Sequence, residues 1–65
     1  MTGEEIRNLR LSLGESQTIF AKRFGVSYMT VGKWENGLFK PLPAFERILQ
    51  SIKIQQIQQT KTVEN

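Results

Sequence analysis

Apolar residues recur every three or four positions in four separate stretches of the chain, and short runs containing Gly, Pro or Ser separate these stretches. This spacing places apolar side chains on one face of an α-helix, and no stretch shows the alternation of a strand. We therefore predict four short helices, including one over residues 17–24 and one over residues 28–35. Helices of about eight residues are not stable alone, so the four must bury their apolar faces against one another. The pattern predicts a compact all-α domain.

Local signals place the ends of the predicted helices. Thr2 and Glu5 have the spacing of a capping box, so the first helix begins after Thr2. Pro43 suits the first turn of the fourth helix, where its missing N–H group loses no partner. From residue 55 the chain is rich in Gln and Thr. We divide the sequence into a folded domain over residues 1–54 and a polar tail over residues 55–65, which we expect to be frayed or disordered.

The apolar faces of the four predicted helices together form one small core. Its expected members are Ile6, Leu9, Leu13, Phe20, Ala21, Phe24, Val31, Trp34, Phe45, Ile48, Leu49 and Ile52. The chain has 65 residues, of which 38% are hydrophobic. A core of this size, without disulfides, usually stabilises a fold by only about 3–5 kcal/mol.

Composition excludes several classes of function. All six acidic residues are Glu, and the chain contains no Asp, His or Cys. It therefore has no disulfide, no thiolate or imidazole metal site, and no triad that depends on His or Cys. The glutamates form no evident pair, so we expect no enzyme, no cofactor and no metal. No apolar run is long enough to span a membrane. A net charge of +3 permits a polyanion as partner but does not establish one.

Only three residues, Gly25 to Ser27, join the second predicted helix to the third. This length and the position of the glycine are typical of a helix-turn-helix. Ala21 is small enough for the two helices to approach closely, while Val31 and Trp34 fill the angle between them. The opposite face of the third helix is then presented to solvent.

A longer string of residues around this turn carries a more specific signal. Its members are Arg10, Gln17, Phe20, Ala21, Gly25, Val26, Ser27, Thr30, Val31, Trp34, Glu35, Asn36 and Gly37. Their spacing resembles, without a gap, that of the Cro/phage-repressor (XRE-type) helix-turn-helix family, and the resemblance covers residues 3 to 52. It implies a lambda-repressor-like domain of four helices, or five if the tail supplies another. It also implies a cytoplasmic protein of prokaryotic or phage origin, associated with the nucleoid when bound.

The resemblance further implies which residues contact DNA, because the third helix of this family lies in the major groove. Expected base contacts are Tyr28, Met29 and Lys33, with Ser27 and Thr30 at the edge of the groove. Lys33 can donate to guanine O6 and N7, and Met29 can contact a thymine methyl group. Expected phosphate contacts are Gln17 and Asn36, with added charge from Lys40 and Lys22.

Other positions have structural roles in the family or depart from its pattern. The residues equivalent to Arg10 and Glu35 form an internal ion pair that ties the first helix to the third. Glu15 stands where the family usually has an apolar residue, and Ile19 where it usually has a polar one. Ile19 is therefore either an exposed contact or a filler of the space that Glu15 leaves. Gly32 lies inside the third helix, at a cost of about 1 kcal/mol relative to Ala.

The segment after the third helix contains four apolar residues, namely Leu38, Phe39, Pro41 and Leu42. Two readings stay open. These residues cap the small core, or Leu38, Phe39 and Leu42 form a dimer contact, since the family commonly pairs two copies through this region. Ile54 and Ile57 can extend the same surface. A symmetric dimer matches a palindromic operator with half-sites about 10 bp apart.

We expect sequence-specific binding of double-stranded DNA by a small transcriptional regulator, a repressor that occupies its operator as a homodimer. One alternative is a protein-binding module, such as the antitoxin of a toxin–antitoxin pair, with or without DNA binding. Its partner would contact the segment 38–42 and the polar tail. A general nucleic-acid binder is a further alternative, but a net charge of only +3 argues against it.

Overall fold

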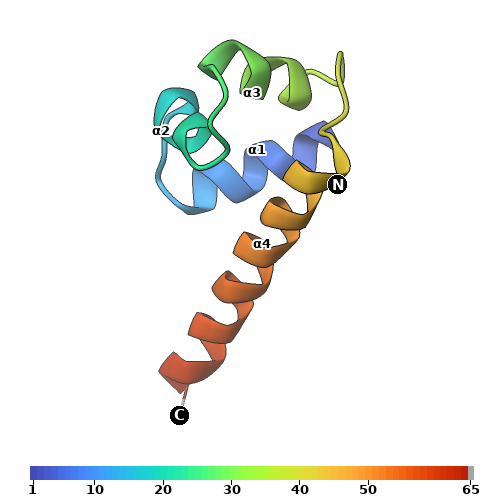
Figure 1. Cartoon of the computed structure of the whole chain (residues 1–65). Coiled ribbons are helices and arrows are strands. Elements are labelled where there is room, and N and C mark those ends of the chain that lie inside the picture. Colours follow the sequence, from blue (N-terminus) through green and yellow to red (C-terminus); the bar gives the residue numbers. More distant parts are fainter. Residues whose placement is uncertain (65) are drawn as a thin grey trace.

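Four α-helices form the protein in the computed structural model, which describes the backbone of residues 1–64 and the side chains of residues 1–56 (Figure 1). They are α1 (Gly3–Ser12), α2 (Gln17–Lys22), α3 (Tyr28–Glu35) and α4 (Pro43–Glu64). The described residues contain no strand. The prediction of a compact all-α domain with four helices is confirmed.

Side-chain caps begin the first three helices, and α1 begins after Thr2 as the sequence predicts. The capping box of α1 is complete, because the Thr2 N–H donates to the Glu5 carboxylate at 2.8 Å and the Glu5 N–H donates to the Thr2 hydroxyl at 3.1 Å. The hydrogen bond from the Thr2 backbone N–H to the Glu5 carboxylate is the main reason that the pKa of Glu5 is lowered. The hydroxyls of Ser16 and Ser27 accept from N–H groups in the first turns of α2 and α3.

The end of α2 differs from the prediction, since the helix stops at Lys22 rather than at Phe24. The Phe24 N–H donates to the carbonyl of Ala21, three residues back, and the Val26 N–H donates to the same carbonyl. These bonds wind the chain into the tight turn toward α3. Gly25 completes the turn with a φ of +68°, a value that glycine adopts without strain.

The core joins all four helices around a cluster of aromatic rings. The ring of Phe24 makes edge contacts with Phe20, Trp34 and Phe45, at centroid distances of 5.2, 5.3 and 6.0 Å. The buried residues are Ile6, Leu9, Phe20, Ala21, Phe24, Val31, Trp34, Leu49 and Ile52. Leu13 and Phe45 pack against them while partly exposed. The prediction was wrong for Ile48, which is 36% exposed because its neighbour Leu49 takes the inward position on α4.

The first residue of α1 rests directly on the backbone at the end of α3. A Cβ atom placed on Gly3 would lie 2.5 Å from the carbonyl oxygens of both Trp34 and Glu35. Atoms of a folded protein do not approach so closely, and the obstacle is backbone rather than a flexible side chain. The spacing between α1 and α3 therefore requires glycine at position 3.

Helices α1, α2 and α3 gather into one body, while α4 continues away from it (Figure 1). The chain accordingly measures 40 Å along its longest axis and 22 and 20 Å along the others. We expected the folded domain to end at residue 54, whereas helical backbone continues to Glu64. Residues 55–64 contain no Gly or Pro, so no residue there interrupts the helix. Fraying of this tail stays a prediction, and Asn65 lies outside the described residues.

The length of α4 invites a comparison with helices that cross membranes. It has 22 residues, but polar side chains interrupt its apolar positions throughout. Within the range that the structure describes, no helix combines the length and the apolar character needed to cross a bilayer.

Replacing Gly3 with Ala should destabilise the fold, because the added methyl group would meet two carbonyl oxygens at 2.5 Å. We expect the Gly3→Ala variant to lose about 1–3 kcal/mol in its free energy of unfolding, measured by urea denaturation. Gly32→Ala is the matched control. Its Cβ would lie 3.7 Å from the nearest atom, so we expect a gain of up to about 1 kcal/mol from helix propensity. Equal stability of Gly3→Ala and the unmodified chain would contradict the close packing of α1 on α3.

Candidate nucleic-acid interface

One face of α3 packs against the core, and the opposite face is exposed to solvent. Val31 is fully buried and Trp34 is 3% exposed, so both anchor α3 to the core. Tyr28 and Met29, in the first turn of α3, are 54% and 58% exposed, and Lys33 is also exposed. Exposed side chains of this size on a rigidly anchored helix are available to a partner surface. These three are the residues predicted to read base edges.

Ser27 and Thr30, the other two predicted base contacts, are engaged at the start of α3. The Ser27 hydroxyl accepts from the Thr30 N–H at 3.4 Å, and the two hydroxyl oxygens lie 3.4 Å apart. Ser27 is exposed, while Thr30 is half-buried. Both hydroxyls lie at the N-terminal end of α3, and the Ser27 hydroxyl caps this end.

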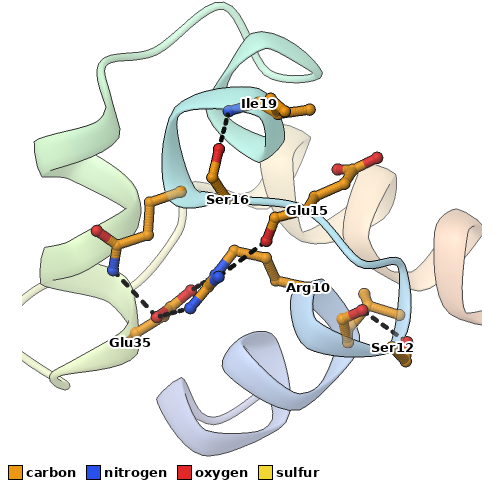
Figure 2. Close-up of polar contacts among 8 residues, drawn as sticks. Arg10, Ser12, Glu15, Ser16, Ile19 and Glu35 are labelled. Carbon is orange, nitrogen blue, oxygen red and sulfur yellow. Dashed lines mark hydrogen bonds and ion pairs between the residues drawn. The ribbon is translucent and has the colours of Figure 1, made fainter.

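The ion pair implied by the resemblance is present between α1 and α3 (Figure 2). Nε of Arg10 donates to Oε2 of Glu35 at 2.6 Å, and the NH2 group of Arg10 donates to Oε1 at 3.1 Å. Only 11% of the Arg10 side chain and 5% of the Glu35 side chain are exposed. The hydrogen bonds to Glu35 raise the pKa of Arg10. The NH1 group of Arg10 donates to the carbonyl of Glu15 at 2.9 Å, so this guanidinium also holds the loop before α2.

Gln17 brings α2 into the same network. Its side-chain nitrogen donates to Oε1 of Glu35 at 3.2 Å, so one carboxylate accepts from α1 and from α2. The Gln17 amide passes beside Gly32, where a Cβ would lie 3.7 Å from the amide nitrogen. These contacts place the Gln17 amide beside Gly32 and Glu35 of α3. Asn36, the other predicted phosphate contact, is exposed at the C-cap of α3.

The segment after α3 folds back over the last turn of that helix. Gly37 has a φ of +77°, and its N–H donates to the carbonyl of Trp34 at 3.2 Å. The Leu38 N–H donates to the carbonyl of Lys33 at 2.9 Å, which completes a Schellman motif. As a result, the ring of Phe39 lies beneath the ammonium group of Lys33, with 4.9 Å from Nζ to the ring centroid.

This arrangement matches a known class of domain. A family model for helix-turn-helix domains matches residues 6–50, which include α2, α3 and the turn between them. The chain belongs to the Cro/C1-type helix-turn-helix family. The resemblance seen in the sequence is thereby confirmed, and the chain is a DNA-binding helix-turn-helix domain. Comparisons with curated proteins and with solved structures found no match.

The helix-turn-helix domain accommodates its unusual Glu15 with a second ion pair. Both oxygens of Glu15 accept from the guanidinium of Arg23, at 2.9 and 2.5 Å. These bonds lower the pKa of Glu15 and raise that of Arg23. Ile19 is 52% exposed, so it does not fill a space in the core. Of the two readings for Ile19, the structure supports an exposed contact.

The remaining predicted residues of the helix-turn-helix domain lie on the surface. Lys22 is at the end of α2 and Lys40 is between α3 and α4, and both are exposed. Among the described residues, neither lysine forms a hydrogen bond or an ion pair with Gln17 or Asn36. The three predicted dimer residues are Leu38, Phe39 and Leu42, which are 69%, 56% and 65% exposed. Such exposure is incompatible with the reading that these three cap the core.

Sequence reasoning missed several contacts of this interface. Phe39 was predicted either to cap the core or to form a dimer contact, and its position beneath the ammonium group of Lys33 was not foreseen. The sequence does contain a signal for this contact. Phe39 is an aromatic residue two positions after Gly37, and a Schellman motif at Gly37 turns the following residues back toward α3. The hydrogen bond from Gln17 to Glu35 was also missed, although both residues belong to the motif.

The buried ion pair predicts a large loss of stability when one partner is removed. We expect the Arg10→Met variant to lose about 3–5 kcal/mol in its free energy of unfolding, because Glu35 would keep a buried charge without its cation. Thermal or urea denaturation at neutral pH measures this loss. The double variant Arg10→Met, Glu35→Gln should recover part of it.

The second ion pair supplies the matched control for this experiment. Arg23 is 40% exposed, so Arg23→Met should cost at most about 1 kcal/mol. Equal losses for Arg10→Met and Arg23→Met would show that burial of the Arg10–Glu35 pair has no special importance for the fold.

Proposed function

We propose that this domain binds double-stranded DNA sequence-specifically, with α3 in the major groove, and acts as a transcriptional repressor on a palindromic operator. The observation that carries the proposal is the two-sided character of α3. Its inner face, with Val31 and Trp34, is buried, while Tyr28 and Met29 project from its outer face more than half exposed. A helix held in this way inserts side chains into the major groove at a fixed angle.

The exposed residues of α3 supply complementary kinds of base contact. Lys33 donates to O6 and N7 of guanine, and Met29 contacts the methyl group of thymine. Tyr28 offers both an apolar ring and a hydroxyl, to a base edge or to a phosphate. Ser27 and Thr30 add hydroxyl groups at the edge of the groove, where caps already orient them. This variety of chemistry supports a preference for particular base pairs.

Gln17 and Asn36 are suited to fix the domain on the phosphate backbone. The Gln17 amide carries two N–H donors, and Glu35 takes one of them, so the second is directed to a phosphate. Arg10 neutralises the Glu35 carboxylate, which would otherwise repel a phosphate bound nearby. Lys40 and Lys22 add positive charge at the surface. These contacts set the register of the protein on DNA, whereas α3 selects the sequence.

Leu38, Phe39 and Leu42 support a homodimer on the operator. They lie within five residues of one another in the segment between α3 and α4, and each is more than half exposed. Two copies related by a two-fold axis present two recognition helices to half-sites about 10 bp apart. Occupancy of such a site represses transcription by blocking access of the polymerase.

In-vitro selection from randomised duplex DNA, at about physiological salt, tests the proposal directly. Nonspecific binding is weak under these conditions, so enrichment reports base readout. We expect a palindrome to be enriched. A single half-site would contradict the dimer and keep the sequence-specific monomer. No enrichment by the folded protein would contradict the proposal and favour a helix-turn-helix used to bind another protein.

Lys33→Ala tests whether the exposed face of α3 reads bases. We expect a loss of about 1–3 kcal/mol in binding to the selected site, together with a relaxed preference at one base pair. Lys53→Ala is the matched control, because Lys53 is also an exposed lysine but lies on α4. It removes the same charge and should leave the preference unchanged. Equal weakening of Lys33→Ala on every sequence would make Lys33 a phosphate contact instead.

A further inference from the structure

The contact between Lys33 and Phe39 has no role in the core. The distance of 4.9 Å from Nζ to the ring centroid is within the range of a cation–π interaction. Phe39 is 56% exposed, so its ring is not held there by burial. Among the described residues, the ion pairs are those of Arg10, Arg23 and the amino terminus, and none involves Lys33. The ring is the interaction partner that the structure gives to this ammonium group.

The segment 37–39 contacts both the backbone and the ammonium group of Lys33. The N–H groups of Leu38 and Phe39 donate to the carbonyl oxygen of Lys33, at 2.9 and 3.3 Å. The positive φ of Gly37 makes this return of the chain possible. Because the backbone of Phe39 is tied to the backbone of Lys33, the ring is presented to the ammonium group by local geometry alone. It does not depend on a second copy of the chain.

We infer that Phe39 is a positioning residue for base recognition, which holds the ammonium group of Lys33 in place for its contact with DNA. This inference rests on the proposed function, in which Lys33 reads a base. A lysine side chain has many rotamers, and fixing them on binding costs free energy. The ring removes part of that cost before DNA arrives. Phe39 therefore sharpens the choice of one base pair without touching it.

Two variants of the full chain separate this role from simple apolar contact. Phe39→Leu removes the ring and keeps an apolar side chain, while Phe39→Tyr keeps the ring. The probe is a duplex with one selected half-site, compared with the same duplex changed at the base pair whose preference Lys33→Ala relaxes. A single half-site removes dimer formation from the measurement. We expect Phe39→Leu to lower the discrimination between the two duplexes about two- to fivefold, and Phe39→Tyr to retain it.

Two further measurements make the result decisive. In the Lys33→Ala background, Phe39→Leu should cause no additional loss of discrimination. Nuclear magnetic resonance should show the Lys33 side-chain methylene protons shifted upfield by the ring, in the unmodified chain and in Phe39→Tyr but not in Phe39→Leu. This shift is measured without DNA, so it tests the contact independently of the proposed function.

Each contrary outcome has one meaning. Absence of the upfield shift in the unmodified chain would overturn the inference and leave the proposed function intact. Unchanged discrimination in Phe39→Leu, with the shift present, would overturn the positioning role and leave Phe39 as a surface or dimer residue. An upfield shift in a protein that prefers no base pair would overturn the proposed function, and the inference with it.

Discussion

The carboxylate of Glu35 connects three helices at one point. Glu35 is the last residue of α3, and its two carboxylate oxygens accept hydrogen bonds from Arg10 of α1 and Gln17 of α2. Only 5% of the Glu35 side chain is exposed. Without the Arg10 cation, burial of this charged carboxylate would therefore cost a large amount of free energy. The orientation of α3 relative to α1 and α2 therefore depends on a charged interaction as well as on apolar packing.

This arrangement links the stability of the domain to its interface. Gln17 donates to the carboxylate that Arg10 neutralises, so a change in the Arg10–Glu35 pair alters a residue that we propose contacts a DNA phosphate. The apolar contacts of Val31 and Trp34 hold α3 against the body, but they tolerate small rotations. The hydrogen bonds at Glu35 are directional, which narrows the range of positions that α3 adopts.

Local signals were sufficient to predict the four helices and much of the core. Thr2, Ser16 and Ser27 cap helices through bonds that span three residues, so their spacing in the sequence already contains the geometry. The contact of Gly3 with the end of α3 was not predictable in this way. It joins residues more than thirty positions apart, and only the packed structure shows how closely two backbones approach.

The candidate site was likewise predictable where the local sequence determines it, and not where it depends on packing. The family motif identified Tyr28, Met29 and Lys33, whose exposure follows from the buried positions between them. The pairing of Glu15 with Arg23 was missed, because it depends on the direction in which α2 leaves the preceding loop. The predicted boundary at residue 54 rests on the Gln-rich composition that follows it. Composition does not determine where α4 ends, because no Gly or Pro in residues 55–64 stops a helix.

The turns that close the helices also bear on how fast the protein folds. At Gly14, Gly25 and Gly37 the chain reverses within a few residues, each time with the same pair of backbone bonds. The turn at Gly25 therefore brings α2 onto α3 after closing only a short loop, and little chain entropy is lost before their apolar faces touch. Proteins dominated by such local contacts fold within microseconds to milliseconds. In a chain emerging from the ribosome, α3 would thus reach its folded position almost as soon as α4 is available to complete the core.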